Sequence, residues 1–305
     1  MLYRMAITYH NMQKYKESAD TFAQVLEAFP QGPHVAESHL RIGDYLVREG
    51  NDPVKAIESY SRAYETDPKG AYAGRALKGL ALARYETKDY ATAMDLFYRV
   101  VTEFPDAPLN EKTYLWTAQE LHTAKKYDES ARVLQALLTA MPNYASPNRV
   151  RFKIAECREL AGKTEEALQL YQAIVTEAPK STEAVESWFR MGKLYETLNQ
   201  PDKAFEMYQE AANTNTGDTA ARARFRIGEI QESKGEFEAA ARSYMRVAIL
   251  FLHEELSPES LWRAGQCYEK ANALEQARKV YNETVEEFPE SGQAAKARER
   301  LAAMG

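Results

Sequence analysis

Histidines, cysteines and one short glycine-lysine-threonine motif are the residues of this 305-residue sequence whose types could support catalysis or metal binding. The histidines, at 10, 34, 39, 122 and 253, do not have the spacing of metal ligands. Cys157 and Cys267 have no companion cysteine close by, and we expect both to be buried packing thiols. The motif at 162–164 resembles the end of a phosphate-binding loop, but Cys157 stands where that loop needs its earlier glycine. The sequence therefore predicts no catalytic residue, no metal site and no cofactor.

Charged side chains that recur at fixed spacing could instead bind a partner. A basic series, which we call the base row, consists of Lys153, Arg190, Arg226 and Arg263. An acidic series six residues further on, which we call the acid row, consists of Glu159, Glu196, Glu232 and Glu269. Glu156 and Glu229 lie midway between the rows, and residues spaced by three or six fall on one face of a helix. Such a face could hold an extended segment of mixed charge. The alternative is a solvated face with pairs inside each helix, such as Lys153 with Glu156, worth about 0.2–0.5 kcal/mol each.

Aromatic residues occupy the corresponding positions in the first half of the chain. Trp116 stands in the series of the base row, whereas Tyr85 and His122 stand in the series of the acid row. A tryptophan on a binding surface is a natural anchor for an apolar side chain of a partner. The alternative is that Trp116 packs against a neighbouring helix, because Leu115 beside it occupies a mostly apolar position.

The composition narrows the class of partner. The chain is 45% hydrophobic and 28% charged with a net charge of -6, which is typical of a folded protein and disfavours nucleic acid as a partner. No apolar run approaches the roughly 20 residues that span a bilayer, so we expect no membrane insertion by this segment. The first residues lack the pattern of a secretory signal.

The elements that must position these residues follow from a repeat of 36 to 38 residues. A first small residue, which we call the small position, recurs at Ala6, Gly43, Ala81, Ala118, Ala155, Gly192, Gly228, Gly265 and Ala302. A second recurs at Ser18, Ala56, Ala93, Ser130, Ala167, Ala204, Ala240 and Ala277, and a large side chain, mostly aromatic, follows it by four residues. Small residues mark the place where two helices cross closely, and the large side chain fills the space beside the crossing. Each repeat is therefore predicted to be a pair of helices, A and B.

Proline ends helix B in six of the eight repeats, because it cannot continue a helix. The six prolines are Pro30, Pro68, Pro105, Pro142, Pro179 and Pro289. In the other two repeats the equivalent residues are Thr216 and Leu252. One helix pair is too thin to bury its apolar face, so the pairs must stack on one another.

This pattern resembles the tetratricopeptide repeat family over essentially the whole chain, and the best-matching segments are 188–211 and 261–289. The resemblance implies an all-α fold, a right-handed superhelical α-solenoid of antiparallel helix pairs over 1–305. The expected repeats are 1–31, 32–69, 70–106, 107–143, 144–180, 181–217, 218–254 and 255–290, with a capping helix at 291–304. The proline precedes the next small position by 13 residues in all six cases. This join is similar to that of bacterial cell-envelope repeat proteins, such as outer-membrane assembly lipoproteins and partners of the Tol–Pal system, which favours the periplasm or cell envelope.

Both ends and two joins depart from the regular pattern. Met1 falls inside the first helix A, so we expect the natural chain to begin further upstream, whereas 291–304 has the charged outer positions of a cap. The join at 211–221 is polar and lacks its proline. The apolar stretch 249–252 extends a helix B, and we favour its packing on the next helix over exposure as a surface for self-association.

The resemblance places helix A on the concave side of the solenoid, so its exposed positions are the predicted binding groove. The groove residues are Tyr85, Trp116, His122, Lys153, Glu156, Glu159, Arg190, Glu196, Arg226, Glu229, Glu232, Arg263 and Glu269. We expect a non-enzymatic scaffold that binds a peptide or protein segment. The alternatives are a passive structural spacer and a regulatory arm of a larger protein. The family's carboxylate clamp is disfavoured, since Phe152 and Glu156 replace its lysine and asparagine.

Overall fold

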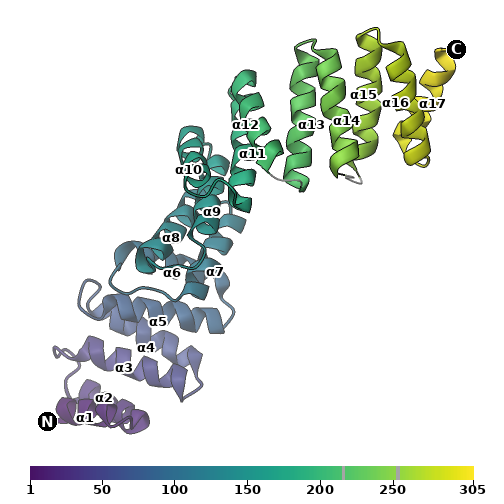
Figure 1. Cartoon of the computed structure of the whole chain (residues 1–305). Helices are drawn as coiled ribbons and strands as arrows, with labels where there is room; N and C mark the ends of the chain where they lie inside the picture. Colours follow the sequence, from purple (N-terminus) through teal and green to yellow (C-terminus); the bar gives the residue numbers. More distant parts are fainter. Residues whose placement is uncertain (215–216, 252–254) are drawn as a thin grey trace. The chain divides into compact units, whose positions relative to one another are not determined.

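The computed structural model describes residues 1–214, 217–251 and 255–305, and every element within these ranges is a helix (Figure 1). Thr216, Leu252 and His253 lie outside these ranges. The chain divides into two compact units, unit 1 from Met1 to Ala145 and unit 2 from Ser146 to Gly305. Each unit is described by itself below.

Unit 1 contains four helix pairs. Its helices are α1 Leu2–Asn11, α2 Tyr15–Ala28, α3 Val35–Arg48, α4 Pro53–Thr66, α5 Ala73–Glu86, α6 Tyr90–Glu103, α7 Glu111–Thr123 and α8 Tyr127–Ala140. Unit 2 contains four further pairs and a last single helix. Its helices are α9 Pro147–Leu160, α10 Thr164–Glu177, α11 Thr182–Thr197, α12 Pro201–Thr214, α13 Asp218–Ser233, α14 Phe237–Phe251, α15 Leu256–Lys270, α16 Leu274–Glu287 and α17 Gly292–Ala303. The predicted all-α fold of stacked helix pairs is confirmed.

Backbone geometry explains where the helices end. Each turn within a pair contains one residue with positive φ, between 46° and 75° in all eight pairs, which reverses the chain after helix A. Asn51, Asn199 and Gly235 are examples, and both residue types tolerate this left-handed conformation. Helix B ends two residues before its proline, because the residue that precedes proline is excluded from the helical region. Phe104, which precedes Pro105, accordingly adopts φ −135° and ψ 66°.

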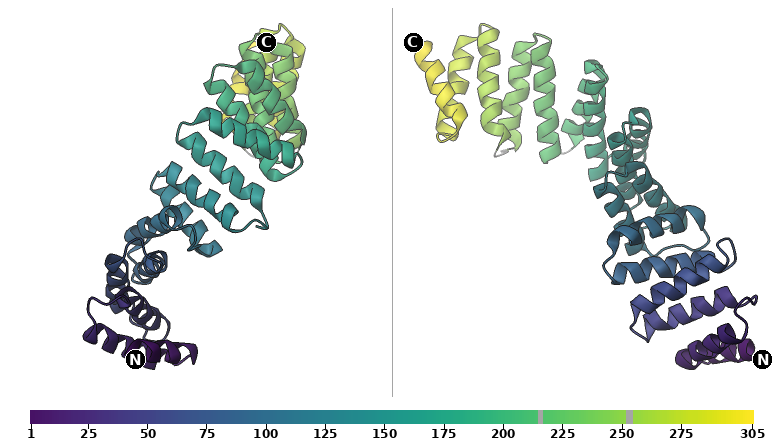
Figure 2. Two further views of the ribbon diagram at one scale, coloured as in Figure 1. Left: turned by 90° about the vertical axis from the view of Figure 1, so that its left-hand side faces the viewer. Right: turned by 180° about the vertical axis from the view of Figure 1, so that it is seen from behind.

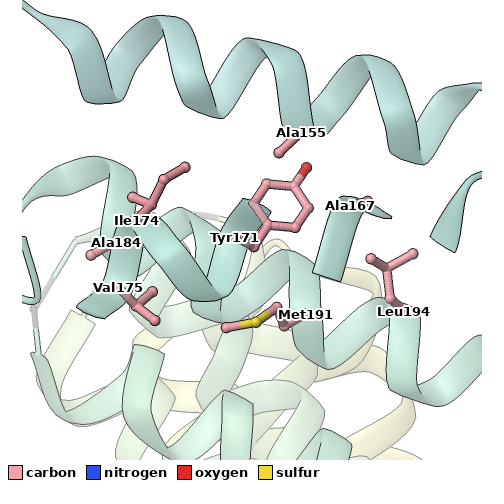
Figure 3. Packing of buried hydrophobic residues seen from close by; sticks show 8 residues of the cluster. All are labelled: Ala155, Ala167, Tyr171, Ile174, Val175, Ala184, Met191 and Leu194. Atoms are coloured by element: carbon pink, nitrogen blue, oxygen red, sulfur yellow. The ribbon is translucent and has the colours of Figure 1, made fainter. Parts of the chain in front are cut away.

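The two small positions and the large side chain lock each pair together. In unit 2, Tyr171, Tyr208, Tyr244 and Tyr281 are fully buried beneath the small positions of their own repeats. Figure 3 shows Tyr171 between the helices with its hydroxyl directed toward Ala155. A β-carbon added at Gly228 would lie 2.6 Å from the Tyr244 ring, so glycine allows the ring to touch the backbone of helix A.

Consecutive helices run antiparallel and lie side by side within each unit (Figures 1 and 2). In unit 2 the odd-numbered helices also contact one another along the series α9, α11, α13, α15 and α17. The A helices of unit 2 therefore form one continuous layer. Side chains of this layer can interact from one repeat to the next.

The apolar extension of α14 does not pack as the sequence analysis favoured. Ile249 and Leu250 are 58% and 60% exposed, and Phe251 is partly buried. The fourth residue of the stretch, Leu252, lies outside the described residues.

Candidate protein-binding surfaces

Three members of the acid row receive hydrogen bonds from buried tyrosines of unit 2. The Tyr171 hydroxyl donates to Glu159 Oε2 at 2.8 Å, and Tyr208 donates to Glu196 Oε2 at 2.9 Å. In the next repeat the Tyr244 hydroxyl donates to Glu232 Oε2 at 3.1 Å. A buried hydroxyl without a partner would cost about 1–3 kcal/mol. These three carboxylates therefore have a structural task within their own helix pairs.

Two arginines of the base row link neighbouring repeats. Arg190 on α11 donates to Glu156 Oε1 on α9 at 2.9 Å and lies 3.4 Å from Glu159 Oε1. Arg263 on α15 lies 3.3 Å from Glu229 Oε1 and 3.7 Å from Glu232 Oε2, both on α13. Their side chains are 24% and 33% exposed, so the pairs are shielded in part from water. The arginines thus join successive A helices through the same carboxylates that hold the tyrosines.

The other two members of the base row have different surroundings. Arg226 pairs with Glu229 on its own helix at 2.8 Å, the kind of pair that the alternative of a solvated face expects, and its side chain is 43% exposed. On the preceding A helix, α11, Lys193 occupies the position that Glu156 and Glu229 fill elsewhere. The carboxylate of that helix whose charge acts on Arg226 is Glu196. Burial alone would lower the pKa of Arg226, but the charges of Glu229 and Glu196 raise that pKa overall. Lys153 is exposed, and the described residues show no ion pair between it and Glu156.

The acid row continues to the last helix in altered form. Glu269 accepts a hydrogen bond from Arg300 Nε on α17 at 3.0 Å. Glu232 also accepts from Lys270 Nζ at 2.7 Å. Burial alone would raise the pKa of Glu232, but the hydrogen bond from Lys270 and the nearby charge of Arg263 lower that pKa overall. Glu232 is therefore held as a carboxylate.

Unit 1 carries a surface of a different kind, formed by Tyr85, Tyr90 and Trp116, which we call the aromatic cluster. The Trp116 ring lies edge-on to Tyr85 with 4.9 Å between centroids, and its centroid lies 6.1 Å from that of Tyr90. The two tyrosine rings are 5.3 Å apart. Tyr85 and Tyr90 are 40% and 45% exposed, whereas Trp116 is half-buried and also contacts the buried ring of Phe97 at 6.0 Å. Trp116 therefore packs on the preceding helix pair and also contributes to an exposed aromatic surface.

Three of the four helix pairs of unit 1 have phenylalanine or leucine where unit 2 has its buried tyrosines. This difference explains why the surface is aromatic and not acidic. The large buried side chains of the first, third and fourth pairs are Phe22, Phe97 and Leu134, which have no hydroxyl to satisfy. No carboxylate is then needed at the position of the acid row. That position holds a ring, which contacts the first residue of helix B. The ring pairs are His10 with Tyr15, Tyr85 with Tyr90, and His122 with Tyr127, at 5.3 to 5.5 Å.

The structure brings together some predicted site residues and leaves others apart. Tyr85 and Trp116 meet as expected, but His122 pairs with Tyr127 and is not part of the aromatic cluster. Sequence reasoning missed Tyr90, although its place at the start of helix B directly follows the short turn after Tyr85. The charged groove residues lie in unit 2 and the aromatic ones in unit 1.

The described residues contain no cluster of three or more histidine, cysteine or acidic side chains that could hold a metal ion. Both cysteines are buried, and burial raises the pKa of the Cys267 thiol to about 12. In the described ranges no helix combines the length and apolar character needed to cross a membrane.

Stacked antiparallel helix pairs with close-packed small residues at each crossing define a helical repeat protein. Two sequence models of the tetratricopeptide repeat match the chain, one at residues 3–71, 56–108 and 189–255 and the other at 149–181 and 259–291. The chain belongs to the tetratricopeptide repeat family. Proteins of this family generally mediate protein–protein interactions. No curated protein matches the sequence.

One solved structure with a TM-score above 0.5 agrees with the helix-pair fold at low sequence identity. A chain in the structure of Naa15/Naa10 bound to HypK-THB is 16% identical and matches with a TM-score of 0.64 over 96% of this chain and 42% of its own length. This chain thus spans less than half of that protein. MamA is 19% identical, with a TM-score of 0.45 over 57% of this chain and 90% of its own. A putative kinesin light chain from Podosopora anserina is 12% identical, with a TM-score of 0.42 over 57% of this chain and 92% of its own.

Proposed function

We propose that this chain is a non-enzymatic scaffold that binds a protein segment, and that the aromatic cluster anchors an apolar side chain of that segment. The single observation that supports this most is the exposure of the Tyr85 and Tyr90 rings in a fixed group around Trp116. Rings already held by one another lose little conformational freedom on binding, and aromatic residues dominate the energetics of protein interfaces.

The charged rows have a secondary part in this proposal. Arg190 and Arg263 already pair with carboxylates of the preceding repeat, so a partner would have to displace these contacts to use them. Lys153 and Arg226 are more exposed and are the members of the base row best placed to contact a partner's carboxylates. A partner segment that met them would gain specificity more than affinity, because exposed ion pairs contribute about 0–1 kcal/mol.

Selection from a random peptide library on the purified chain tests the proposal. Truncation of an anchoring ring costs about 2 kcal/mol or more, which is roughly a 30-fold loss of affinity. We expect selected peptides to contain an apolar or aromatic residue and to bind Tyr90→Ala and Trp116→Ala at least tenfold more weakly. Leu274→Ala, which removes a side chain that is 49% exposed in unit 2, is the control and should leave affinity unchanged.

Two outcomes of the selection would contradict the proposal. Peptides whose affinity is the same for wild type and both ring variants would place binding elsewhere. Failure to select any peptide above background would favour the passive spacer. Circular dichroism of Tyr90→Ala, which removes an exposed ring, separates lost binding from lost folding.

A role in bacterial cell-envelope assembly is the finer form of this proposal. It is supported by the constant 13-residue distance from proline to the next small position. Cell fractionation of a tagged natural protein tests it directly. Recovery with the periplasm or envelope agrees with the role, and recovery with the cytosol contradicts it.

A further inference from the structure

Unit 2 contains a basic cavity between α12, α13 and α14, and no member of the base row or the acid row lines it. The cavity has a volume of about 210 Å³. Its lining residues are Phe205, Gln209, Arg224, Ile227, Gln231, Ala239, Arg242, Ser243 and Arg246. Three of these are arginines and none is a carboxylate, which is unusual in a chain with a net charge of -6. The rest of the polar lining consists of two glutamines and a serine. The glutamine amides can donate hydrogen bonds to an anion, whereas the Ser243 hydroxyl donates to Gln231 Oε1 at 2.6 Å.

Among the described residues, two of the three guanidinium groups have no compensating carboxylate. Arg242 lies 3.6 Å from Glu238 on its own helix. Arg224 is half-buried, and its one hydrogen bond in the described part of the chain goes from Nη2 to Asn213 Oδ1 at 3.0 Å. Its Nε is buried and has no hydrogen-bond partner there. For Arg246, which is exposed, no ion pair is found within residues 1–214, 217–251 and 255–305.

The charge of one arginine acts directly on the other. Burial, first, and the nearby charge of Arg246 both lower the pKa of Arg224. Two uncompensated cations that face one cavity are unfavourable unless an anion joins them. An anionic ligand between the two groups would relieve this repulsion.

We propose that this cavity binds a phosphoryl group, held by Arg224 and Arg246. A phosphomonoester carries a charge of about −1.5 to −2 at neutral pH, which matches two free guanidinium groups better than a single carboxylate does. Its three terminal oxygens accept several charge-assisted hydrogen bonds at once, and arginine presents paired donors in a suitable geometry. The site is separate from the aromatic cluster and does not depend on it.

The phosphoryl group could belong to free inorganic phosphate or to a phosphorylated peptide, and α14 offers a way to distinguish them. Arg242, Arg246 and Leu250 are spaced by four residues, so they lie on one face of the helix. Leu250 is 60% exposed beside the cavity's arginines along this face. A peptide attached to the phosphoryl group could use this apolar side chain, whereas inorganic phosphate could not.

Titration followed by the arginine Nε–Hε resonances in NMR spectra tests the site at constant ionic strength. The probes are inorganic phosphate, sodium acetate and a blocked Gly-phosphoserine-Gly peptide with its unphosphorylated counterpart. We expect the two phosphoryl probes to shift the Arg224 signal saturably and the other two probes to leave it in place. Arg246→Ala should weaken phosphoryl binding about tenfold or more, since hydrogen bonds to charged groups carry such a share of affinity.

A matched control uses Arg62→Ala in unit 1. Arg62 is exposed and pairs with a glutamate one turn earlier, as Arg242 does, but it does not line this cavity. This variant should bind the phosphoryl probes like the wild type. Equal weakening by Arg62→Ala and Arg246→Ala, or no saturable shift with either phosphoryl probe, would overturn the proposal.

The remaining outcomes identify the source of the phosphoryl group. Tighter binding of the phosphopeptide than of phosphate, reduced by Leu250→Ser, supports a phosphorylated partner. Equal affinity for the two probes, unaffected by Leu250→Ser, supports free phosphate. Circular dichroism of Arg246→Ala, in which an exposed side chain is shortened, verifies that the fold is intact.

Discussion

The hydrogen bond between Tyr171 and Glu159 gives the sharpest test of the structural task assigned to the acid row. Tyr171 is fully buried, and its hydroxyl lies 2.8 Å from a carboxylate oxygen. A hydrogen bond to a charged group contributes about 1.5–3 kcal/mol, and an orphaned buried hydroxyl costs about 1–3 kcal/mol. We expect Glu159→Leu to lower the free energy of unfolding by about 2 kcal/mol and Tyr171→Phe by about 1 kcal/mol.

The double variant separates this bond from other effects of each substitution. When both partners are absent no hydroxyl is left unsatisfied, so the double variant should be more stable than the sum of the single effects by about 1.5 kcal/mol. Urea unfolding followed by far-UV circular dichroism measures the free energy of unfolding of the wild type, the two single variants and the double variant. The four values can be compared if the slope of that free energy against urea concentration is the same in all of them. Single effects that add within about 0.5 kcal/mol would refute the assigned task.

Unit 1 offers the converse experiment. Phe97→Tyr would bury a hydroxyl where the acid-row position holds Tyr85 and supplies no carboxylate. We expect this substitution to lower the free energy of unfolding by about 1–3 kcal/mol. Adding Tyr85→Glu should restore part of that loss, and a further loss would contradict the reasoning.

Three further predictions concern pH, packing and thiol reactivity. Burial, first, and a nearby carboxylate raise the pKa of Tyr171 above its usual value of 10.0, so the folded state keeps the hydroxyl protonated. The contribution of this group to the free energy of unfolding is complete below pH 10 and should fall by about 1.4 kcal/mol per pH unit above it. Urea unfolding at several alkaline pH values would measure this fall. A free energy of unfolding that does not fall with pH would contradict the prediction. Gly228→Ala should lower the free energy of unfolding by about 1–3 kcal/mol because its β-carbon would meet Tyr244, whereas Gly292→Ala, which meets nothing within 4 Å, should not be destabilising. Cys267 should react with a thiol reagent at pH 8 only after urea unfolding, because burial raises its pKa to about 12; fast reaction of the folded protein would show that the thiol is accessible.

The helix pairs could be predicted from the sequence because each of the signals that define them is local. Small residues at a constant period, an aromatic residue four positions further and a proline at the end of helix B depend on one helix at a time. The left-handed residue of each turn was harder to predict, because lysine and glutamine occupy it in some pairs, at Lys88 and Gln13.

The partners of the acid row could not be read from spacing within one helix. Tyr208 and Glu196 meet because helices A and B cross at Gly192, and Arg190 reaches Glu156 because successive pairs stack. A usable signal was nevertheless present. In the last four repeats a tyrosine four residues after the second small residue always accompanies a glutamate at the acid-row position, and this combination of positions does not occur in the first four.

The aromatic cluster was predicted only in part, because only some of its residues stand out in the repeat pattern. Trp116 and Tyr85 were identified because their types break the charged pattern, whereas Tyr90 follows no such break and enters through the geometry of the turn. The exposure of Ile249 and Leu250 was also missed, since an apolar run on a helix has the same sequence pattern whether or not another helix covers it.

The central claim is that the aromatic cluster binds the partner while the charged rows mainly hold the repeats together. Its most direct test is the affinity of one library-selected peptide for Trp116→Ala and for Arg226→Ala. Isothermal titration calorimetry on both variants and the wild type would give the comparison. We expect at least a tenfold loss for Trp116→Ala and less than a threefold loss for Arg226→Ala, whose exposed pair contributes about 0–1 kcal/mol. A peptide that depends on Arg226 and ignores Trp116 would contradict the account.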